Sequence, residues 1–193
     1  MTAIHSVAVF CGSRVGISPA YAQAGRDLGQ GLAQAGIRLV YGGGRIGIMG
    51  VVADATLAAG GTVLGVIPEF LAKWEVAHEG VTEMVVTQSM HTRKRRLYEE
   101  SDAFVIMPGG LGTFDEAFEI ITWRQLRLHD KPIILCNVEG SIEPFVATID
   151  HAIEQGFADP ACRQLFEVID GVPAVLERLR ALPAGTGGPA ERL

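Results

Sequence analysis

Short apolar runs alternate along the chain with longer segments whose apolar residues recur at helical spacing. The runs, rich in β-branched residues, predict strands at 6–10, 38–40, 62–67, 82–86, 103–107, 132–137 and 166–168. The periodic segments predict helices at 19–35, 48–59, 90–100, 114–128, 142–155 and 173–182. Local punctuation agrees, because Ser18-Pro19 is a typical helix start and glycines stand at 36, 60 and 156, where helices should end.

This alternation of strand and helix predicts the fold class. The strands are apolar on both faces, which is typical of a parallel sheet buried under helices on each side. We therefore predict an α/β fold with a doubly wound parallel sheet, helices on both faces and a single domain over residues 1–182. Proline, glycine and small residues dominate 183–193, for which we predict a disordered tail.

Composition narrows the classes of function. The 193 residues, of which 48% are hydrophobic, suit one globular domain. A net charge of −6 gives no reason to expect nucleic acid as a partner. The three cysteines are widely spaced, so neither a disulfide framework nor a zinc site is expected, and a reducing cytoplasm is the default location. No targeting segment is recognisable, and no run approaches the ~18 apolar residues of a membrane span, so we expect no membrane partner.

The most informative motif is a glycine-rich turn between an apolar run and a helical segment. Residues 108–116 read Pro-Gly-Gly-Leu-Gly-Thr-Phe-Asp-Glu. Glycines let backbone N–H groups approach a phosphate, and the positive end of the following helix favours an anion there. Two more glycine turns follow strands, at 11–14 and 41–50. Because such turns lie at the carboxyl ends of parallel strands, all three loops should face one crevice.

The turn at 41–50 also satisfies the dinucleotide-binding fingerprint, with Gly42, Gly44 and Gly47 at its glycine positions. That fingerprint belongs on the first turn of the fold, with an acidic residue ~20 positions further on. Here the turn is the second, and the nearest acid after the next strand is Glu69. We therefore do not expect NAD, and the loop serves either close helix–sheet packing or direct ligand contact.

Residues 90–96, Met-His-Thr-Arg-Lys-Arg-Arg, concentrate positive charge on an acidic chain. On a helix Arg93 and Arg96 share one face while Lys94 points elsewhere, so these cations cannot all serve one ligand. A solvated basic face is the simpler interpretation of Arg95 and Arg96. For Arg93 we favour a functional role, because a guanidinium can hold a phosphate, a ribose or a carboxylate through paired hydrogen bonds.

Taken together, these motifs resemble one family. Met-His-x-Arg-Lys at 90–94 and Pro-Gly-Gly-x-Gly-Thr-x-x-Glu at 108–116, with the turns at 11–13 and 41–50, look like the pattern of the LOG ("lonely guy") family. Its members are cytokinin riboside 5′-monophosphate phosphoribohydrolases, often mislabelled as lysine decarboxylases. The resemblance implies a Rossmann-like homodimer that hydrolyses the N-glycosidic bond of an N6-substituted adenosine monophosphate, giving free base and ribose 5-phosphate. We expect no cofactor and, since the histidines lack metal-ligand spacing, no metal.

The resemblance also assigns residues. The catalytic pair falls on Arg93 and Glu116. Substrate contacts fall on Glu75, Lys94, Gly110, Leu111, Gly112, Thr113, Phe114, Asp115 and Thr122. To the substrate-binding set we add neighbouring positions of the same motifs, namely Gly12, Ser13, Gly43, Met90 and Gly109.

Two interpretations of Glu116 compete. Breaking an N-glycosidic bond builds positive charge on the ribose, so a carboxylate can stabilise the transition state and orient or deprotonate a water. Thr113-x-x-Glu116 is also a capping box, in which Thr113 caps the helix and Glu116 reaches back to the cap N–H. Arg93 and the family match favour catalysis, with the guanidinium holding Glu116 ionised or binding ribose and phosphate oxygens.

The helical segment 114–128 predicts a subunit interface. Its apolar residues exceed one face of a helix, which fits burial against a second subunit. We therefore expect a homodimer.

Three functions remain open. The first is the phosphoribohydrolase, either selective for cytokinin nucleotides or a broader nucleoside monophosphate glycosidase. The second is a non-catalytic carrier of a nucleotide or of the molybdenum cofactor, against which the Arg93–Glu116 pair argues. The third is decarboxylation, which needs a lysine to form a Schiff base with pyridoxal phosphate. Its candidates, Lys73, Lys94 and Lys131, stand in no recognisable setting.

Overall fold

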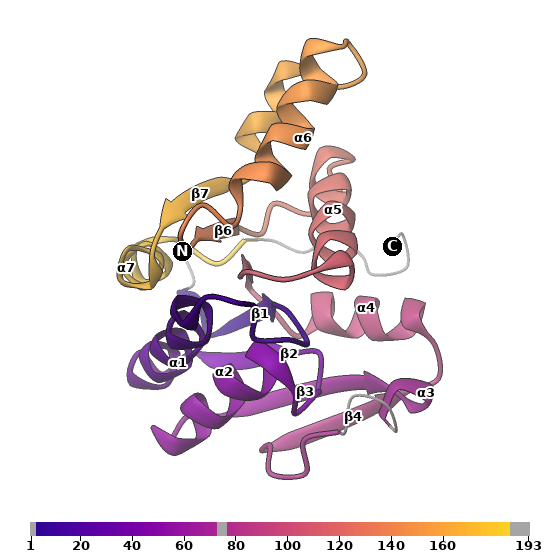
Figure 1. Cartoon of the computed structure of the whole chain (residues 1–193). Coiled ribbons are helices and arrows are strands. Elements are labelled where there is room, and N and C mark those ends of the chain that lie inside the picture. The colour runs from indigo at the N-terminus through magenta and orange to yellow at the C-terminus, as the bar shows by residue number, and fades with distance from the viewer. Residues whose placement is uncertain (1–2, 73–76, 186–193) are drawn as a thin grey trace.

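One sheet organises the molecule (Figure 1). The structure is a computed structural model that describes residues 3–72 and 77–185. Within these residues seven parallel strands pair in the order β4-β3-β2-β1-β5-β6-β7. They are Ser6–Phe10 (β1), Arg38–Tyr41 (β2), Val63–Pro68 (β3), Glu83–Thr87 (β4), Ala103–Ile106 (β5), Ile133–Asn137 (β6) and Glu167–Asp170 (β7). The predicted strands are confirmed, with small differences at their ends.

Helices cover both faces of the sheet. One face carries Pro19–Gln34 (α1), Gly47–Ala58 (α2) and Val172–Ala181 (α7). The other carries Met90–Glu99 (α4), Leu111–Gln125 (α5) and Glu143–Glu154 (α6). This is the predicted doubly wound α/β fold. Two short elements were not predicted, because neither is long enough to show a helical period: Glu69–Ala72 (α3) and the 3-10 helix Pro160–Gln164 (η1).

Strand β1 shows why the sequence lacks an apolar–polar alternation. Val7 and Val9 pack with α1, α2 and α7, whereas Ala8 and Phe10 pack with α4, α5 and α6. All four side chains are buried, so both faces of the strand must be apolar.

The direction of winding reverses between β1 and β5. These strands are neighbours, yet the chain continues outward from β1 through β2 on one side and from β5 through β6 on the other. In such sheets ligands bind beyond the carboxyl ends of the strands at this switch point. The two loops meet there, since the Gly12 N–H donates to the Pro108 carbonyl at 3.0 Å.

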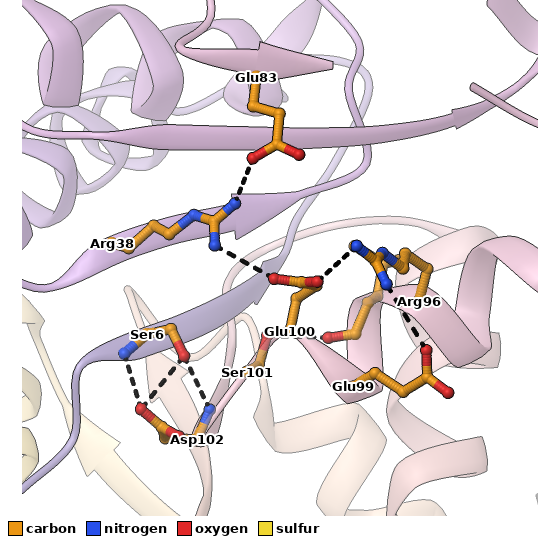
Figure 2. A network of polar contacts seen from close by, with 9 residues as sticks. Ser6, Arg38, Glu83, Arg96, Glu99, Glu100, Ser101 and Asp102 are labelled. Carbon is orange, nitrogen blue, oxygen red and sulfur yellow. Dashed lines mark hydrogen bonds and ion pairs between the residues drawn. The ribbon is translucent and has the colours of Figure 1, made fainter. Parts of the chain in front are cut away.

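A polar network holds together the opposite, amino-terminal edge of the sheet (Figure 2). The Asp102 carboxylate accepts from the Ser6 N–H at 2.9 Å and from the Ser6 hydroxyl at 3.1 Å. Arg38 bridges Glu83 at 2.9 Å and Glu100 at 3.1 Å. These contacts join the starts of β1, β2, β4 and β5, so they stabilise the sheet far from the switch point.

The predicted tail, 183–193, falls largely outside the described residues. Pro183 forms an isolated antiparallel bridge with Ala3. Residues 186–193 lie beyond the described range, and their disorder stays a prediction. In the described part of the chain, no helix combines the length and apolar character needed to cross a membrane.

Candidate active site

Helix α5 begins within the glycine motif, earlier in the chain than predicted. The helix begins at Leu111, its N-cap is Gly110, and no side chain caps it. Thr113 therefore lies inside the first turn, and Glu116 follows one turn later. The capping-box interpretation is wrong, because the flexible Gly109-Gly110 pair lets the chain turn into the helix before Thr113. Thr113 packs instead against Gly109, where a Cβ atom would overlap its side chain.

The start of α5 is an open cradle. The first N–H groups of a helix have no partner within it, and here they carry no side-chain cap. A Cβ atom built at Gly110 or Gly112 would meet no neighbour within 4 Å. These two glycines thus leave space above the positive end of the helix, as an anion site requires.

Arg93 and Glu116 form a buried ion pair beside this cradle. Arg93 Nη1 donates to Glu116 Oε1 at 2.7 Å, and the two residues are 6% and 9% exposed. Arg93 Nε donates to the Val66 carbonyl at 3.1 Å. Helix α4 is itself fixed at its start by a capping box between Ser89 and Thr92. Burial raises the pKa of Glu116, and the charge and hydrogen bond of Arg93 oppose that rise.

The backbone of the second glycine turn lies against the Arg93 side chain. A Cβ atom at Gly42 would overlap Arg93 Nη2, so only glycine leaves room for the guanidinium in this position. The loop at 41–50 therefore contributes to the site through Arg93. Gly43, with φ 79°, lies against Ile67 and Met84 and lines neither cavity of the crevice.

Two adjoining cavities occupy the switch point. The one that contains the ion pair has a volume of about 200 Å³, and the described residues that line it include most of the predicted set: Gly12, Ser13, Met90, Arg93, Gly110, Leu111, Gly112, Thr113, Asp115 and Glu116. The second cavity measures about 640 Å³ and shares Gly12, Ser13, Gly110 and Leu111 with the first. Gly109 lines the second cavity but not the first. The loops after β1 and β5 thus face one crevice, and the third loop of the prediction, 41–50, contributes Ile48 and Met49 to its walls.

Several predicted site residues lie elsewhere. Lys94 forms ion pairs with Asp115 at 2.7 Å and Glu119 at 3.3 Å. Phe114 packs on Phe145, with ring centroids 5.6 Å apart, and Thr122 is exposed on α5. None of Lys94, Phe114 and Thr122 lines the cavities at the switch point. Glu75 lies outside the described residues. Substrate contacts by these residues stay predictions.

Other lining residues were not predicted as contacts. Ile48 and Met49 lie within the second glycine turn, 41–50, and that position was the available signal. Leu71 comes from α3, which left no signal in the sequence. Cys11 lines the cavity beside the ion pair, and burial raises the pKa of its thiol, which keeps it neutral. Among the described residues, no group of three or more His, Cys, Asp and Glu could hold a metal ion.

A third cavity, of about 670 Å³, lies at the far end of α5. It is lined by residues of 124–130 other than Leu126 and by residues of 159–165, in and beside η1, and it contains none of the predicted site residues. Its arginines and aspartates are mixed, so its charge favours no single class of ligand. The predicted site residues that line any of these three cavities are therefore found at the switch point and not in the third cavity.

Comparison with known proteins places these motifs in context. A family model described as "Possible lysine decarboxylase" matches residues 49–179. A cytokinin riboside 5′-monophosphate phosphoribohydrolase of Rhodococcoides fascians is 44% identical over 177 residues, which are 91% of this chain and 89% of that protein. An enzyme of the same name from Arabidopsis thaliana is 43% identical over 176 residues, covering 91% of this chain and 81% of its own.

Solved structures with the same fold are more distant in sequence. A molybdenum cofactor carrier protein from Chlamydomonas reinhardtii superposes with a TM-score of 0.68 at 21% identity, covering 94% of this chain and 100% of its own. A molybdenum cofactor binding protein from Rippkaea orientalis gives a TM-score of 0.66 at 20% identity, with 94% and 97% covered. At this identity the likeness concerns the fold alone.

Proposed function

This chain belongs to the LOG family of cytokinin riboside 5′-monophosphate phosphoribohydrolases, and on that premise we propose that it hydrolyses the N-glycosidic bond of adenosine 5′-monophosphates, N6-substituted ones included. The products are the free base and ribose 5-phosphate. One observation carries the proposal: the ion pair of Arg93 and Glu116 borders the same small cavity as the open start of α5.

The geometry suits each part of the reaction. An anion held at the start of α5 fixes the substrate, while Glu116 lies one helical turn away and faces the sugar. As the bond to the base breaks, positive charge develops on the ribose, and the Glu116 carboxylate stabilises it and orients a water. Arg93 keeps Glu116 ionised in its buried setting and fixes its direction.

The described lysines do not favour a decarboxylase. A Schiff-base lysine must reach its carbonyl partner with a free amine. Lys94 is paired with two carboxylates, and Lys131 is buried with Nζ donating to the Tyr98 carbonyl at 2.7 Å. Lys73 lies outside the described residues. The family label therefore finds no support in the positions of Lys94 and Lys131.

A carrier function rests on fold similarity alone, because the carrier proteins share about a fifth of their residues with this chain. Holding a cofactor requires no buried carboxylate aimed into the site. Burying Glu116 and Arg93 together costs desolvation energy, and a role in catalysis gives a reason for that cost.

The test is release of base and ribose 5-phosphate from isopentenyladenosine monophosphate and from AMP. We expect turnover by the wild type and loss of about 100-fold or more in Glu116→Gln and Arg93→Ala, with folding retained. The ratio of the two wild-type rates measures the preference for an N6 substituent. No release by the wild type from either substrate, despite nucleotide binding, overturns the proposal and favours a carrier.

We further propose a cytoplasmic homodimer. Phe118 on α5 and Leu126 at its C-cap are 38% and 63% exposed, which supports burial of this helix against a second copy. The cysteines at 11, 136 and 162 are all free, as a reducing compartment favours. Light scattering on wild type and Leu126→Glu tests the interface. We expect a dimer for the wild type and a monomer for the variant, and a monomeric wild type contradicts the expectation.

A further inference from the structure

The cavity that holds the ion pair is too small for a whole nucleotide. Its volume is about 200 Å³, whereas ligand pockets usually measure roughly 300–1,000 Å³. The adjoining cavity of about 640 Å³ shares four lining residues with it and opens beside the start of α5. If the ribose lies beside Glu116, part of the substrate must extend into this second cavity.

The charges of the two cavities differ. The cavity of the ion pair is lined by Asp115 and Glu116 as well as Arg93, and its apolar wall consists of Met49, Leu71 and Met90. The second cavity has Arg14 on its wall, and no carboxylate occurs among the described residues that line it. The two carboxylates of the first cavity are already paired with Arg93 and Lys94, so that cavity offers a phosphate dianion no free side-chain cation, whereas the second cavity offers Arg14.

Other cations near the site are already engaged. Arg93 donates through Nε to Val66 and through Nη1 to Glu116, and its Nη2 is packed on Gly42. Lys94, which lines neither cavity, is paired with Asp115 and Glu119. Arg14 is exposed, and no ion pair with another described residue engages it. Of these three cations, Arg14 is the one free to bind a substrate anion.

The backbone of Arg14 is held in place by close packing. Gly47, with φ 65°, begins α2, and a Cβ atom there would overlap the backbone of Ser13 and Arg14. The Gly12 carbonyl accepts from the Ile48 N–H at 3.0 Å. The loop after β1 is therefore fixed against the start of α2, facing the start of α5 across the cavity.

We propose that the second cavity is the phosphate subsite and that Arg14 binds the 5′-phosphate of the substrate together with the first N–H groups of α5. The base then lies toward the apolar wall of Met49, Leu71 and Met90. This assignment rests on the proposed function, because it takes the ribose to lie beside Glu116. It also replaces Arg93 with Arg14 as the side chain that binds phosphate.

The experiment compares two ligands that differ only in the phosphate. Calorimetric affinities for AMP and adenosine are measured in the Glu116→Gln background, which prevents turnover, with Arg14→Ala, Arg14→Lys and the matched control Arg45→Ala added. Arg45 is also exposed and follows β2, but it lines neither cavity. We expect Arg14→Ala to weaken AMP binding about tenfold and to leave adenosine binding unchanged, since a charge-assisted hydrogen bond to phosphate is lost.

Arg14→Lys should retain part of the AMP affinity, because it keeps the charge and loses the paired geometry. Arg45→Ala should change neither ligand. AMP affinity that is unaffected by Arg14→Ala, an equal loss for AMP and adenosine, or AMP that binds no better than adenosine before Arg14 is altered would each overturn the subsite. Arg14-dependent AMP binding without base release by the wild type would retain the subsite and remove the hydrolase.

Discussion

The backbone of Gly42 supports the guanidinium of Arg93, because a Cβ atom at position 42 would overlap Nη2 of that side chain. The guanidinium is thereby held between the Val66 carbonyl and Glu116. A glycine that lines neither cavity thus sets the direction of the cation paired with Glu116, the carboxylate of the proposed mechanism.

We expect Gly42→Ala to lower kcat about tenfold or more with little change in KM, because displaced Arg93 no longer aligns Glu116. Steady-state kinetics over a range of pH measures the effect. The acid limb of the pH profile should move to higher pH, since the opposing effect of Arg93 on the Glu116 pKa is weakened.

Gly31→Ala is the matched control for this variant. A Cβ atom there would overlap a Leu176 side chain in the packing of α1 on α7, remote from the ion pair. It should lower stability without moving the pH profile. In an Arg93→Lys background, which lacks Nη2, Gly42→Ala should have little further effect, and full additivity of the two changes would contradict the positioning role.

The wild-type pH profile follows from the burial of Glu116. Burial raises the pKa of its carboxyl, and the proposed mechanism uses the ionised form. We therefore expect kcat/KM to fall with decreasing pH at values above the ordinary pKa of a glutamate. The measurement is kcat/KM for AMP hydrolysis from about pH 8, through the range of about pH 5 to 8 in which proteins tend to be most stable, down to the pH at which this protein begins to unfold. Rates that stay flat to the acid limit of folding would show that the reaction does not depend on a Glu116 carboxyl whose pKa is raised.

The sequence reveals the fold more completely than the site. Apolar strands such as β1 and the glycine turns after them are local signals, so the elements and the crevice could be predicted. The contact of Gly42 with Arg93 could not, because it joins residues far apart in the chain. Thr113 shows the other limit: its spacing to Glu116 fits a capping box, and only the geometry of Gly110 shows that the helix begins earlier.

The Asp102 network should govern stability without affecting catalysis. Asp102→Ala removes the acceptor of the Ser6 N–H and hydroxyl at the amino-terminal edge of the sheet (Figure 2). We expect a loss of about 1–3 kcal/mol in the free energy of unfolding, measured with urea. Because this edge is opposite the crevice, kcat should be unchanged below the unfolding transition. A lowered kcat in fully folded protein would show that the network also shapes the site.

His129 gives the fold an acid-sensitive point. Burial lowers its pKa to about 4; the residue is 6% exposed, and Nε2 is hydrogen-bonded to the Ile120 carbonyl at 2.9 Å. The unfolded chain binds a proton near pH 6.5, whereas the folded chain stays neutral until about pH 4. The stability contribution of neutral His129 is therefore complete above pH 6.5 and is lost as the pH falls toward 4.

Between pH 7.5 and 5 this loss amounts to about 2 kcal/mol in the free energy of unfolding. Urea unfolding of wild type and His129→Gln at both pH values isolates the effect, because glutamine can still donate near the Ile120 carbonyl but does not titrate. Buried carboxylates contribute equally to both proteins, so the difference between them reports His129. We expect the wild type to lose about 2 kcal/mol more than the variant. Equal losses would mean that His129 is protonated as readily in the folded chain as in the unfolded one.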